Sequence, residues 1–293
     1  QIFFVAYGTI EILINNEKTI FMSNITLSKK TIIASIISSA VVFSLFVVLS
    51  LIATNSSSLP QLQTSSRTQL AQISGAGSGL VAHYTFDEGL GTVAGDSAGS
   101  NTGTLANNPT WMAGKVGSSA LGFGGVFESS AKVVSVGSDI LGTGPLTISA
   151  WINPTSYGQQ RGVIVSNGYT RFRLHDNGSL GFTSNGLVNE AYSADITLNR
   201  WSHVVAVRNS SNLVTFYMDG AVSDISNQNT GTPNAGSLTA IGDNGIASAI
   251  FEGSIDDVRV YNRTLDVNEV GQLFALGGGT PPPPPSGGTT CTS

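Results

Sequence analysis

Residues 79–276 predict an all-β fold, an antiparallel sandwich of two packed sheets. Roughly a dozen short strands follow one another at about 8–12 residue spacing, with no helix between them. Apolar and polar residues alternate along 80–86 and along 146–152, as they do in strands with one buried face. The whole chain has 35 glycines and only 11% charged residues, against about 25% in an average domain. Such a composition is typical of strands joined by many turns.

Two β-hairpins stand out in the sequence. Asn177-Gly178 separates RFRLH from SLGF, and Asp219-Gly220 separates LVTFYM from AVSDI. Both dipeptides favour the left-handed backbone that a tight hairpin turn requires. Further strands are expected at 163–165, 201–208 and 255–261.

One helix is predicted near the end of the sandwich. Asp266 precedes Glu269 by three residues, which is the spacing of a capping box. Val270, Leu273 and Phe274 then follow at helical spacing.

The remaining segments differ in composition from the sandwich. Residues 1–30 form an N-terminal extension that ends in the basic pair Lys29-Lys30, and 31–53 are 23 residues without a charge. This apolar run predicts a hydrophobic helix, either an uncleaved transmembrane anchor or a signal peptide. We predict that the polar residues 54–78 form a flexible linker and that the Gly/Pro-rich segment 277–293 forms a second spacer. We therefore expect further domains beyond Ser293 and an extracellular or cell-surface location, membrane-anchored or secreted.

Charge and cysteine content exclude several classes of partner and cofactor. Residues 79–276 contain nine Lys and Arg against sixteen Asp and Glu, a net charge of −7. Phosphates attract basic surfaces, so no nucleic-acid partner is expected. With Cys291 as the only cysteine, the chain can form neither an internal disulfide nor a cysteine-based metal site.

Six sequence blocks carry a resemblance to a known family. In chain order they are GLVAHYTFDEGLGTVAGDSAGSNTGTL, ALGFGG, LTISAWINP, RWSHVVAVR, FYMDG and FEGSIDDVRVYNRTLD. Together they resemble the laminin-G-like jelly-roll domains of the concanavalin A-like lectin/glucanase superfamily, over almost all of 79–276. The resemblance implies a jelly-roll sandwich, often a bound Ca²⁺ ion, and binding of glycans or proteins outside the cell.

Catalytic motifs are missing from the sequence. The glucanases of this superfamily carry an ExDxxE strand motif, and no glutamate here is followed by Asp at that spacing. Retaining glycoside hydrolysis needs two carboxyl groups about 5–5.5 Å apart. There is also no GxSxG motif, and His83, His175 and His203 sit on apparent strands, where we interpret them as structural. We predict that the module is not an enzyme.

Calcium is the expected cofactor, with Asp96, Asn101 and Asp256 as the candidate ligands. Loop 96–101 is rich in the oxygen atoms that Ca²⁺ takes as ligands. In IDDVRVY, strict alternation places Asp256 on the apolar face of Val258 and Val260, and Asp257 on the opposite face. The resemblance implies that Asp256 and the Asp96 loop meet beside the metal. Alternatively, Asp96 caps a turn and Asp256 lies at a hydrated strand end.

Three loop tyrosines are the candidate ligand-binding residues. Tyr157, Tyr169 and Tyr192 lie near predicted loops, where an exposed ring can stack on a sugar. The alternative for each is packing at the rim of the core.

Two functions remain after these exclusions. The first is a calcium-stabilised binding or adhesion module that recognises a glycan or an extracellular protein. The second is an accessory lectin-like domain of a secreted carbohydrate-active enzyme whose catalytic domain lies outside this chain. A glucanase-type glycosidase is disfavoured by the missing carboxylate motif.

Overall fold

The computed structural model describes residues 77–124, 131–157, 162–186, 190–243 and 249–280, and the backbone of three short strands near the N-terminus. The chain divides into two compact units, Gln1–Thr68 and Gln69–Ser293. In the first unit, an antiparallel sheet consists of β1 (Ile2–Val5), β2 (Thr9–Ile14) and β3 (Ile20–Phe21), in that order. No sequence pattern described above predicts these strands.

The predicted hydrophobic helix at 31–53 lies outside the described residues. The same holds for most of the predicted linker 54–78 and for residues 281–293 of the second spacer. In the part of the chain that the structure describes, no helix is both long and apolar enough to cross a bilayer.

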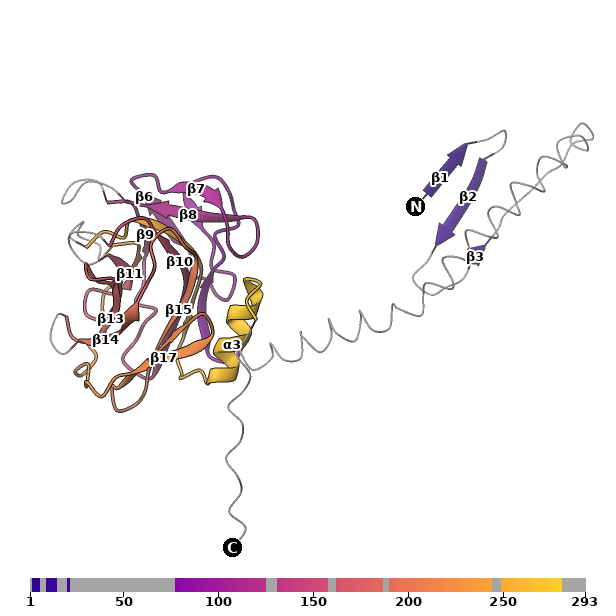
Figure 1. The fold of residues 1–293 in the computed structure, drawn as a ribbon. Helices are drawn as coiled ribbons and strands as arrows, with labels where there is room; N and C mark the ends of the chain where they lie inside the picture. The colour runs from indigo at the N-terminus through magenta and orange to yellow at the C-terminus, as the bar shows by residue number, and fades with distance from the viewer. Residues whose placement is uncertain are drawn as a thin grey trace, which may run out of the picture. The chain divides into compact units, whose positions relative to one another are not determined.

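The second unit is a sandwich of two antiparallel sheets (Figure 1). In spatial order, the first sheet consists of β17 (Ala221–Ile225), β16 (Val214–Met218), β15 (Ser202–Arg208), β10 (Leu146–Pro154), β19 (Gly253–Tyr261), β8 (Ser119–Phe123) and β7 (Thr110–Ala113), with β4 (Leu80–Tyr84) also paired to β19. The second sheet consists of β14 (Ala191–Asp195), β13 (Ser179–Thr183), β12 (Arg171–Leu174), β11 (Val163–Ser166), β18 (Thr239–Ile241), β9 (Val133–Val136), β6 (Gly103–Ala106) and β5 (Val93–Ala94). The prediction of an all-β, two-sheet fold is confirmed.

The core lies between the inner faces of the two sheets. On β10, Ile148 and Ile152 are fully buried, and Ile152 lies opposite Ile255 of β19. From the second sheet, the buried rings of Phe172 and Phe182 lie 6.4 Å apart between centroids. Complete burial of one such side chain contributes about 1.5–3 kcal/mol, so this apolar layer holds the two sheets together.

Both predicted hairpins form around residues in the left-handed region. Asp219 and Gly220 join β16 to β17 with φ values of 50° and 79°. Between β12 and β13, Gly178 has a φ of 91° and donates its N–H to the carbonyl of His175. Local turn chemistry is therefore sufficient to fix where these strands reverse.

A second, smaller core lies on the outer face of the first sheet. There α3 (Val267–Leu276) buries Val270 and Leu273 against the sheet residues Val205 and Tyr217. Figure 1 shows α3 lying against this sheet. Among the described residues, no such helix covers the outer face of the second sheet.

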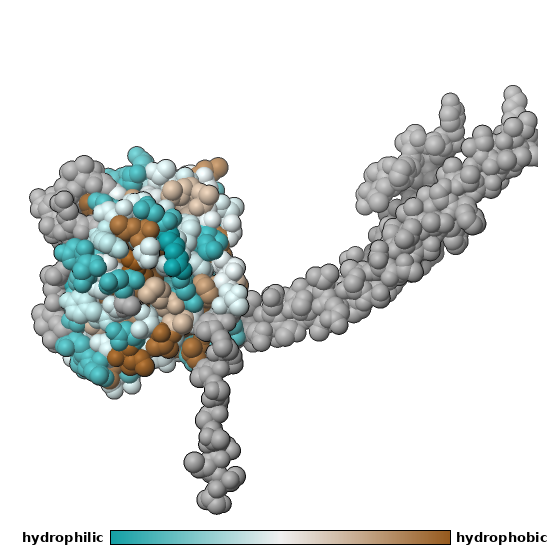
Figure 2. All heavy atoms as spheres, in the orientation of Figure 1, coloured by the Kyte–Doolittle hydropathy of each residue, from teal (hydrophilic) through white to brown (hydrophobic). Residues whose placement is uncertain are grey.

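Exposed apolar residues are scattered over the visible surface rather than gathered into one face. Figure 2 shows small apolar patches separated by polar residues, with some near β17 and α3. The exposed apolar residues of β17 are Val222 and Ile225. Apolar residues scattered singly in this way are normal on a protein surface.

The contribution of the α3 cap to stability can be measured by mutation. The Asp266 carboxylate accepts N–H groups from Asn268 and Glu269, and the Glu269 carboxylate accepts the N–H of Asp266. We expect Asp266→Ala to lower the free energy of unfolding by about 1 kcal/mol, or about 2–4 °C in Tm for a domain of this size. The matched control is Asp224→Ala, at an exposed position of β17. Equal melting temperatures for the two variants would contradict the role of the cap.

Candidate functional site

The predicted ligand Asp96 is held in a closed set of hydrogen bonds. Its Oδ1 accepts N–H groups from His83 and Ala98, and its Oδ2 accepts the N–H and the side-chain amide of Asn101. Burial raises the pKa of Asp96, but these donors lower it by more, so the carboxylate is ionised. Four donors take the lone pairs that a cation would use, and Asp96 therefore stabilises the turn of loop 96–101.

The predicted facing of Asp256 is wrong. Asp257 has a φ of 46°, and two residues of β19 lie opposite one residue of β10 between the Trp151–Asp256 and Ser149–Arg259 pairs. This β-bulge shifts the alternation by one residue. Val258 and Val260 face the core as expected, but Asp256 faces outward with Trp151 and Arg259.

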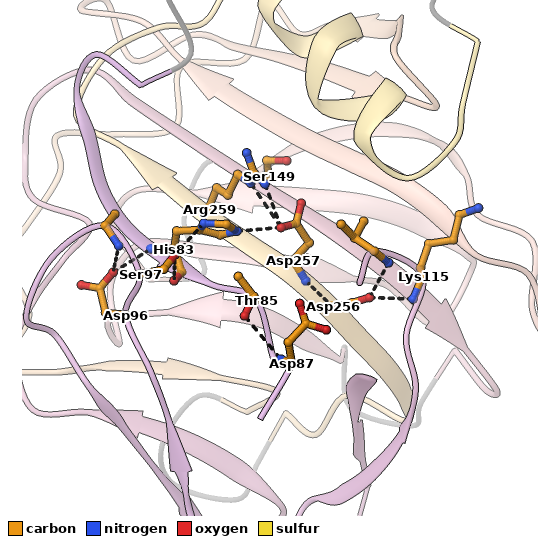
Figure 3. A network of polar contacts seen from close by, with 12 residues as sticks. His83, Thr85, Asp87, Asp96, Ser97, Lys115, Ser149, Asp256, Asp257 and Arg259 are labelled. Atoms are coloured by element: carbon orange, nitrogen blue, oxygen red, sulfur yellow. Dashed lines mark hydrogen bonds and ion pairs between the residues drawn. The ribbon is translucent and has the colours of Figure 1, made fainter. Parts of the chain in front are cut away.

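The three predicted calcium ligands consequently do not come together. Figure 3 shows Asp96 and Asp256 at opposite ends of a polar network on the outer face of the first sheet. Asp256 accepts the N–H groups of Lys115, Val116 and Asp257. Burial raises the pKa of Asp256 to about 6, with a smaller contribution from the neighbouring charge of Asp257.

A nearby carboxylate was missed by the sequence analysis. Asp87 follows β4 and accepts N–H groups from Ser118 and Ser119 through Oδ1, while no hydrogen bond joins its Oδ2 to another described residue. The β7–β8 turn thus binds both carboxylates, since the N–H groups of Lys115 and Val116 in the same turn donate to Asp256. Figure 3 shows Asp87 and Asp256 near each other. A cation at this turn would have Asp87 and Asp256 as ligands, rather than Asp96 and Asn101.

The middle of the network is an ion-paired chain. Asp257 accepts from His83 Nε2 at 2.7 Å and from Arg259 Nη2 at 2.9 Å, and Ser97 Oγ lies 2.8 Å from His83 Nδ1. Burial alone would raise the pKa of Asp257, but His83 and Arg259 hold it below its usual value. Ser97, His83 and Asp257 thus form a Ser–His–Asp chain, although no local sequence motif predicts it. Because Arg259 shares the carboxylate and Ser97 Oγ also contacts the carbonyl of His83, we interpret the chain as a clamp between β4, β19 and loop 96–101.

Tyr157 does not have the exposed ring that was predicted. It is half-buried against the main core, and its hydroxyl donates to the carbonyl of Ile196 at 2.8 Å. A Cβ at Gly178 would lie 3.1 Å from the ring. Tyr157 therefore packs against the β12–β13 turn, as the alternative interpretation had it.

Tyr192, in contrast, presents its ring to solvent. It lies on β14 opposite Gly181 and is 47% exposed. The ring packs on His175 with centroids 4.9 Å apart, and its hydroxyl donates to Glu190 Oε2 at 3.4 Å. His175 and Glu190 thus orient the ring of Tyr192, and part of the ring remains exposed to solvent.

Beneath Tyr192 lies a buried charged cluster. The Arg173 guanidinium donates through Nε and Nη2 to both oxygens of Glu190, and His175 Nε2 lies 3.0 Å from Glu190 Oε1. All three residues are less than 9% exposed. Burial raises the pKa of Glu190, but His175 and Arg173 lower it by more, so Glu190 is ionised at neutral pH.

Glycine makes this arrangement possible. A Cβ at Gly181 would overlap both Glu190 Oε1 and His175 Nε2. Only a residue without a side chain lets the cluster approach the sheet so closely. No local sequence pattern indicates Arg173, Glu190 or Gly181, because their contacts join residues from three different strands or loops.

Tyr169 is the third predicted aromatic and is 45% exposed. It lies in the turn before β12, where its N–H donates to Asn167 Oδ1 and its carbonyl accepts from Gly186. Next to it, Arg171 is half-buried and donates through Nε and Nη2 to the carbonyl of Gly168. Tyr169 and Tyr192 are therefore both placed at strands β12–β14, and we name Tyr169, Arg171, Arg173, His175, Gly181, Glu190 and Tyr192 the tyrosine face.

Removing the charge of Glu190 tests the buried cluster. At pH 7, Glu190→Gln leaves Arg173 buried without its counter-ion and should cost about 3–5 kcal/mol of unfolding free energy. Because the native pKa of Glu190 is lowered, its stabilisation is present above the unfolded pKa of about 4.3 and is lost as the pH falls through the native pKa. The difference between wild type and variant should therefore shrink below about pH 4. Chemical denaturation from pH 3 to pH 8 measures it.

Two further variants serve as controls for that experiment. Asp195→Asn changes an exposed carboxylate of β14 and should have little effect. The double variant Arg173→Met/Glu190→Leu removes both charges and should be more stable than Glu190→Gln. A pH-independent loss in Glu190→Gln would contradict the ion-pair description.

Comparison with known proteins agrees with the fold. Residues 128–271 match the family model described as the concanavalin A-like lectin/glucanases superfamily. Among curated proteins, none matches the sequence. Domain 4 of AbnA, an extracellular GH43 arabinanase from Geobacillus stearothermophilus solved with arabinotriose, is similar with a TM-score of 0.52 and 19% identity, over 68% of this chain and 98% of that domain.

Two larger proteins contain a similar domain. Trypanosoma rangeli sialidase, solved with sialic acid, has a TM-score of 0.51 and 16% identity over 67% of this chain, which spans 32% of the sialidase. The binding domain of botulinum neurotoxin DC, solved with rat synaptotagmin II, has a TM-score of 0.52 and 14% identity over 68% of this chain, which spans 52% of that domain. Because identities this low establish only the fold, the family match carries the assignment. Over residues 128–271, the β-sandwich of this chain matches the laminin-G-like family of the concanavalin A-like lectin/glucanase superfamily.

Proposed function

We propose that the sandwich is a non-enzymatic, extracellular glycan-binding module of a larger secreted or cell-surface protein. The observation that carries the proposal is Tyr192, a half-exposed ring held over the buried cluster of Arg173, His175 and Glu190. A pyranose presents C–H bonds on its face, and an aromatic ring with a negative face attracts them. Hydrogen-bonding side chains beside such a ring then orient the sugar hydroxyls.

The buried cluster holds the ring of Tyr192 in one orientation, which favours binding of a sugar. A free tyrosine on a strand has several rotamers, and fixing one of them costs conformational entropy. Here His175 packs against one side of Tyr192, and Glu190 accepts its hydroxyl. The ring is already oriented, so less entropy is lost on binding a sugar.

A second candidate function is an accessory lectin-like domain of a carbohydrate-active enzyme. The similarity to domain 4 of the arabinanase supports it, because that domain is matched over 98% of its length. The two candidates share the same sugar-binding step and differ in which other domains the whole protein carries. A protein ligand is a further possibility in this fold, as the neurotoxin binding domain is solved with synaptotagmin II.

The absence of catalysis is part of the proposal. On the tyrosine face, Glu190 is the one carboxylate of the described cluster, and Arg173 holds both of its oxygens. A carboxylate held in this way is a poor proton donor and a poor nucleophile. We assign a structural role to the Ser97–His83–Asp257 chain on the other sheet, because Arg259 shares the Asp257 carboxylate.

A glycan array with the purified 293-residue chain tests binding and catalysis together. We expect retention on one or more glycans, loss of at least about tenfold in affinity for Tyr192→Ala, and little change for Tyr192→Phe, which keeps the ring. Ile225→Ala, an exposed apolar position on the other sheet, is the matched control. The retained glycan should be recovered intact.

Three results would contradict the proposal. Absence of retention on every glycan would remove the sugar-binding function. Retention that Tyr192→Ala leaves unchanged would place the site elsewhere. Hydrolysis that disappears in Ser97→Ala or Glu190→Gln would mean that the domain is catalytic.

Calcium is proposed as a stabilising ion at the β7–β8 turn, with Asp87 and Asp256 as its carboxylate ligands. The fit rests on two observations. Among the described residues, none is hydrogen-bonded to Asp87 Oδ2, and Asp256 is a buried carboxylate whose pKa is raised to about 6. A cation beside Asp256 would favour its ionised form. Bound calcium would supply positive charge and fix the turn.

Thermal unfolding with calcium or with chelator tests this proposal. An ion at a hundred times its Kd stabilises the native state by about 2.7 kcal/mol, so Tm should rise by about 5–10 °C. Asp256→Asn and Asp87→Asn should each abolish most of the increase. Asp96→Asn is the control and should keep it, because Asp96 belongs to a separate turn. Equal melting temperatures with calcium and with chelator would rule out a stabilising site.

A further inference from the structure

The two exposed tyrosines lie at different places beside the same three strands. Tyr192 is on β14, opposite Gly181 of β13, which in turn lies opposite Arg173 of β12. Tyr169 precedes Arg173 by four residues, in the turn that leads into β12. They are therefore separated both along the strands and across them.

The register gives an approximate separation. With a rise of about 3.3 Å per residue and about 4.8 Å between strands, the two Cα atoms are about 10–16 Å apart, depending on the path of the turn. Stacked rings lie about 4.5–7 Å apart between centroids. The two positions are therefore far enough apart for each tyrosine to stack on a sugar ring of its own.

A hydrogen-bond donor, Arg171, lies between the positions of Tyr169 and Arg173 along the chain. Arg171 pairs with Thr183 on β13, one side-chain repeat along β12 from Arg173. Whereas Glu190 binds Arg173, no carboxylate among the described residues is hydrogen-bonded to Arg171, whose Nε and Nη2 donate to the carbonyl of Gly168. A guanidinium has five N–H donors, so Arg171 keeps donors for an oxygen-rich ligand. The negative charge of Glu190 also acts on Arg171, so a neutral sugar with free hydroxyls is sufficient as the ligand.

We propose that the tyrosine face binds an oligosaccharide of at least two sugar rings, one on Tyr192 and another on Tyr169, with Arg171 donating to the sugar oxygens between them. This inference rests on the proposed glycan-binding function and adds the length of the ligand and a second subsite. Tyr192, which the buried cluster orients, forms the primary subsite. Tyr169 forms the secondary one, since its ring has no comparable support among the described contacts.

A series of linear oligosaccharides tests the inference with the 293-residue chain. The probes are arabinose, xylose, mannose, glucose and galactose, each as the free sugar and as chains of two to six units. In the series that is retained, we expect affinity to rise with length until both rings are covered and then to level off. Tyr169→Ala should weaken the long chains by at least about tenfold but leave the shortest retained ligand unchanged.

The variants separate this inference from the function on which it rests. Tyr192→Ala should weaken all lengths, and Arg171→Met should weaken only ligands long enough to reach beyond Tyr192. Ile225→Ala is the control for both, and melting temperatures confirm that each variant folds. If the monosaccharide binds as tightly as the hexasaccharide, or Tyr169→Ala changes no length while Tyr192→Ala does, the two-subsite inference fails and the binding function stands. If no probe of any length is retained, both fail.

Discussion

An ionised side chain that is removed from water must be paired, and this constraint organises both outer faces of the sandwich. On the second sheet, Arg173 and Glu190 are almost fully buried and bind each other through two hydrogen bonds. On the first sheet, Asp257 is paired with His83 and Arg259. An unpaired charge at either place would cost several kcal/mol. The strands must therefore adopt the register that brings the partners together.

The shapes of the two faces follow from these pairs. Gly181 is required because any side chain would overlap the Glu190–His175 contact. With the cluster in place, His175 and Glu190 support Tyr192 from below, and its ring is left half-exposed. On the other sheet, the bulge at Asp257 turns Asp256 outward toward the β7–β8 turn. A charged cluster that stabilises a fold can in this way also orient the groups that meet a ligand.

Much of the fold was predictable because its signals are local. The Asp219-Gly220 turn and the Asp266–Glu269 cap each depend on residues that are neighbours in sequence, and both form as predicted. The candidate site was only partly predictable. Alternation placed Asp256 with Val258, but the bulge at Asp257 depends on pairing with β10, more than a hundred residues earlier. For the same reason no pattern indicated Asp87, Arg173 or Glu190, whose partners come from other segments. Composition alone also could not separate the packed Tyr157 from the exposed Tyr169 and Tyr192.

The central claim is that ligand contact occurs on the outer face of β12–β14. The most direct measurement is an NMR titration of backbone amide shifts in the 293-residue chain, with a glycan that the chain retains on an array. We predict that the largest shift changes lie in 168–175, at Gly181 and in 190–193. The account would be contradicted by shifts confined to residues 82–87 and 114–119 on the other sheet, or by the absence of any shift at saturating glycan.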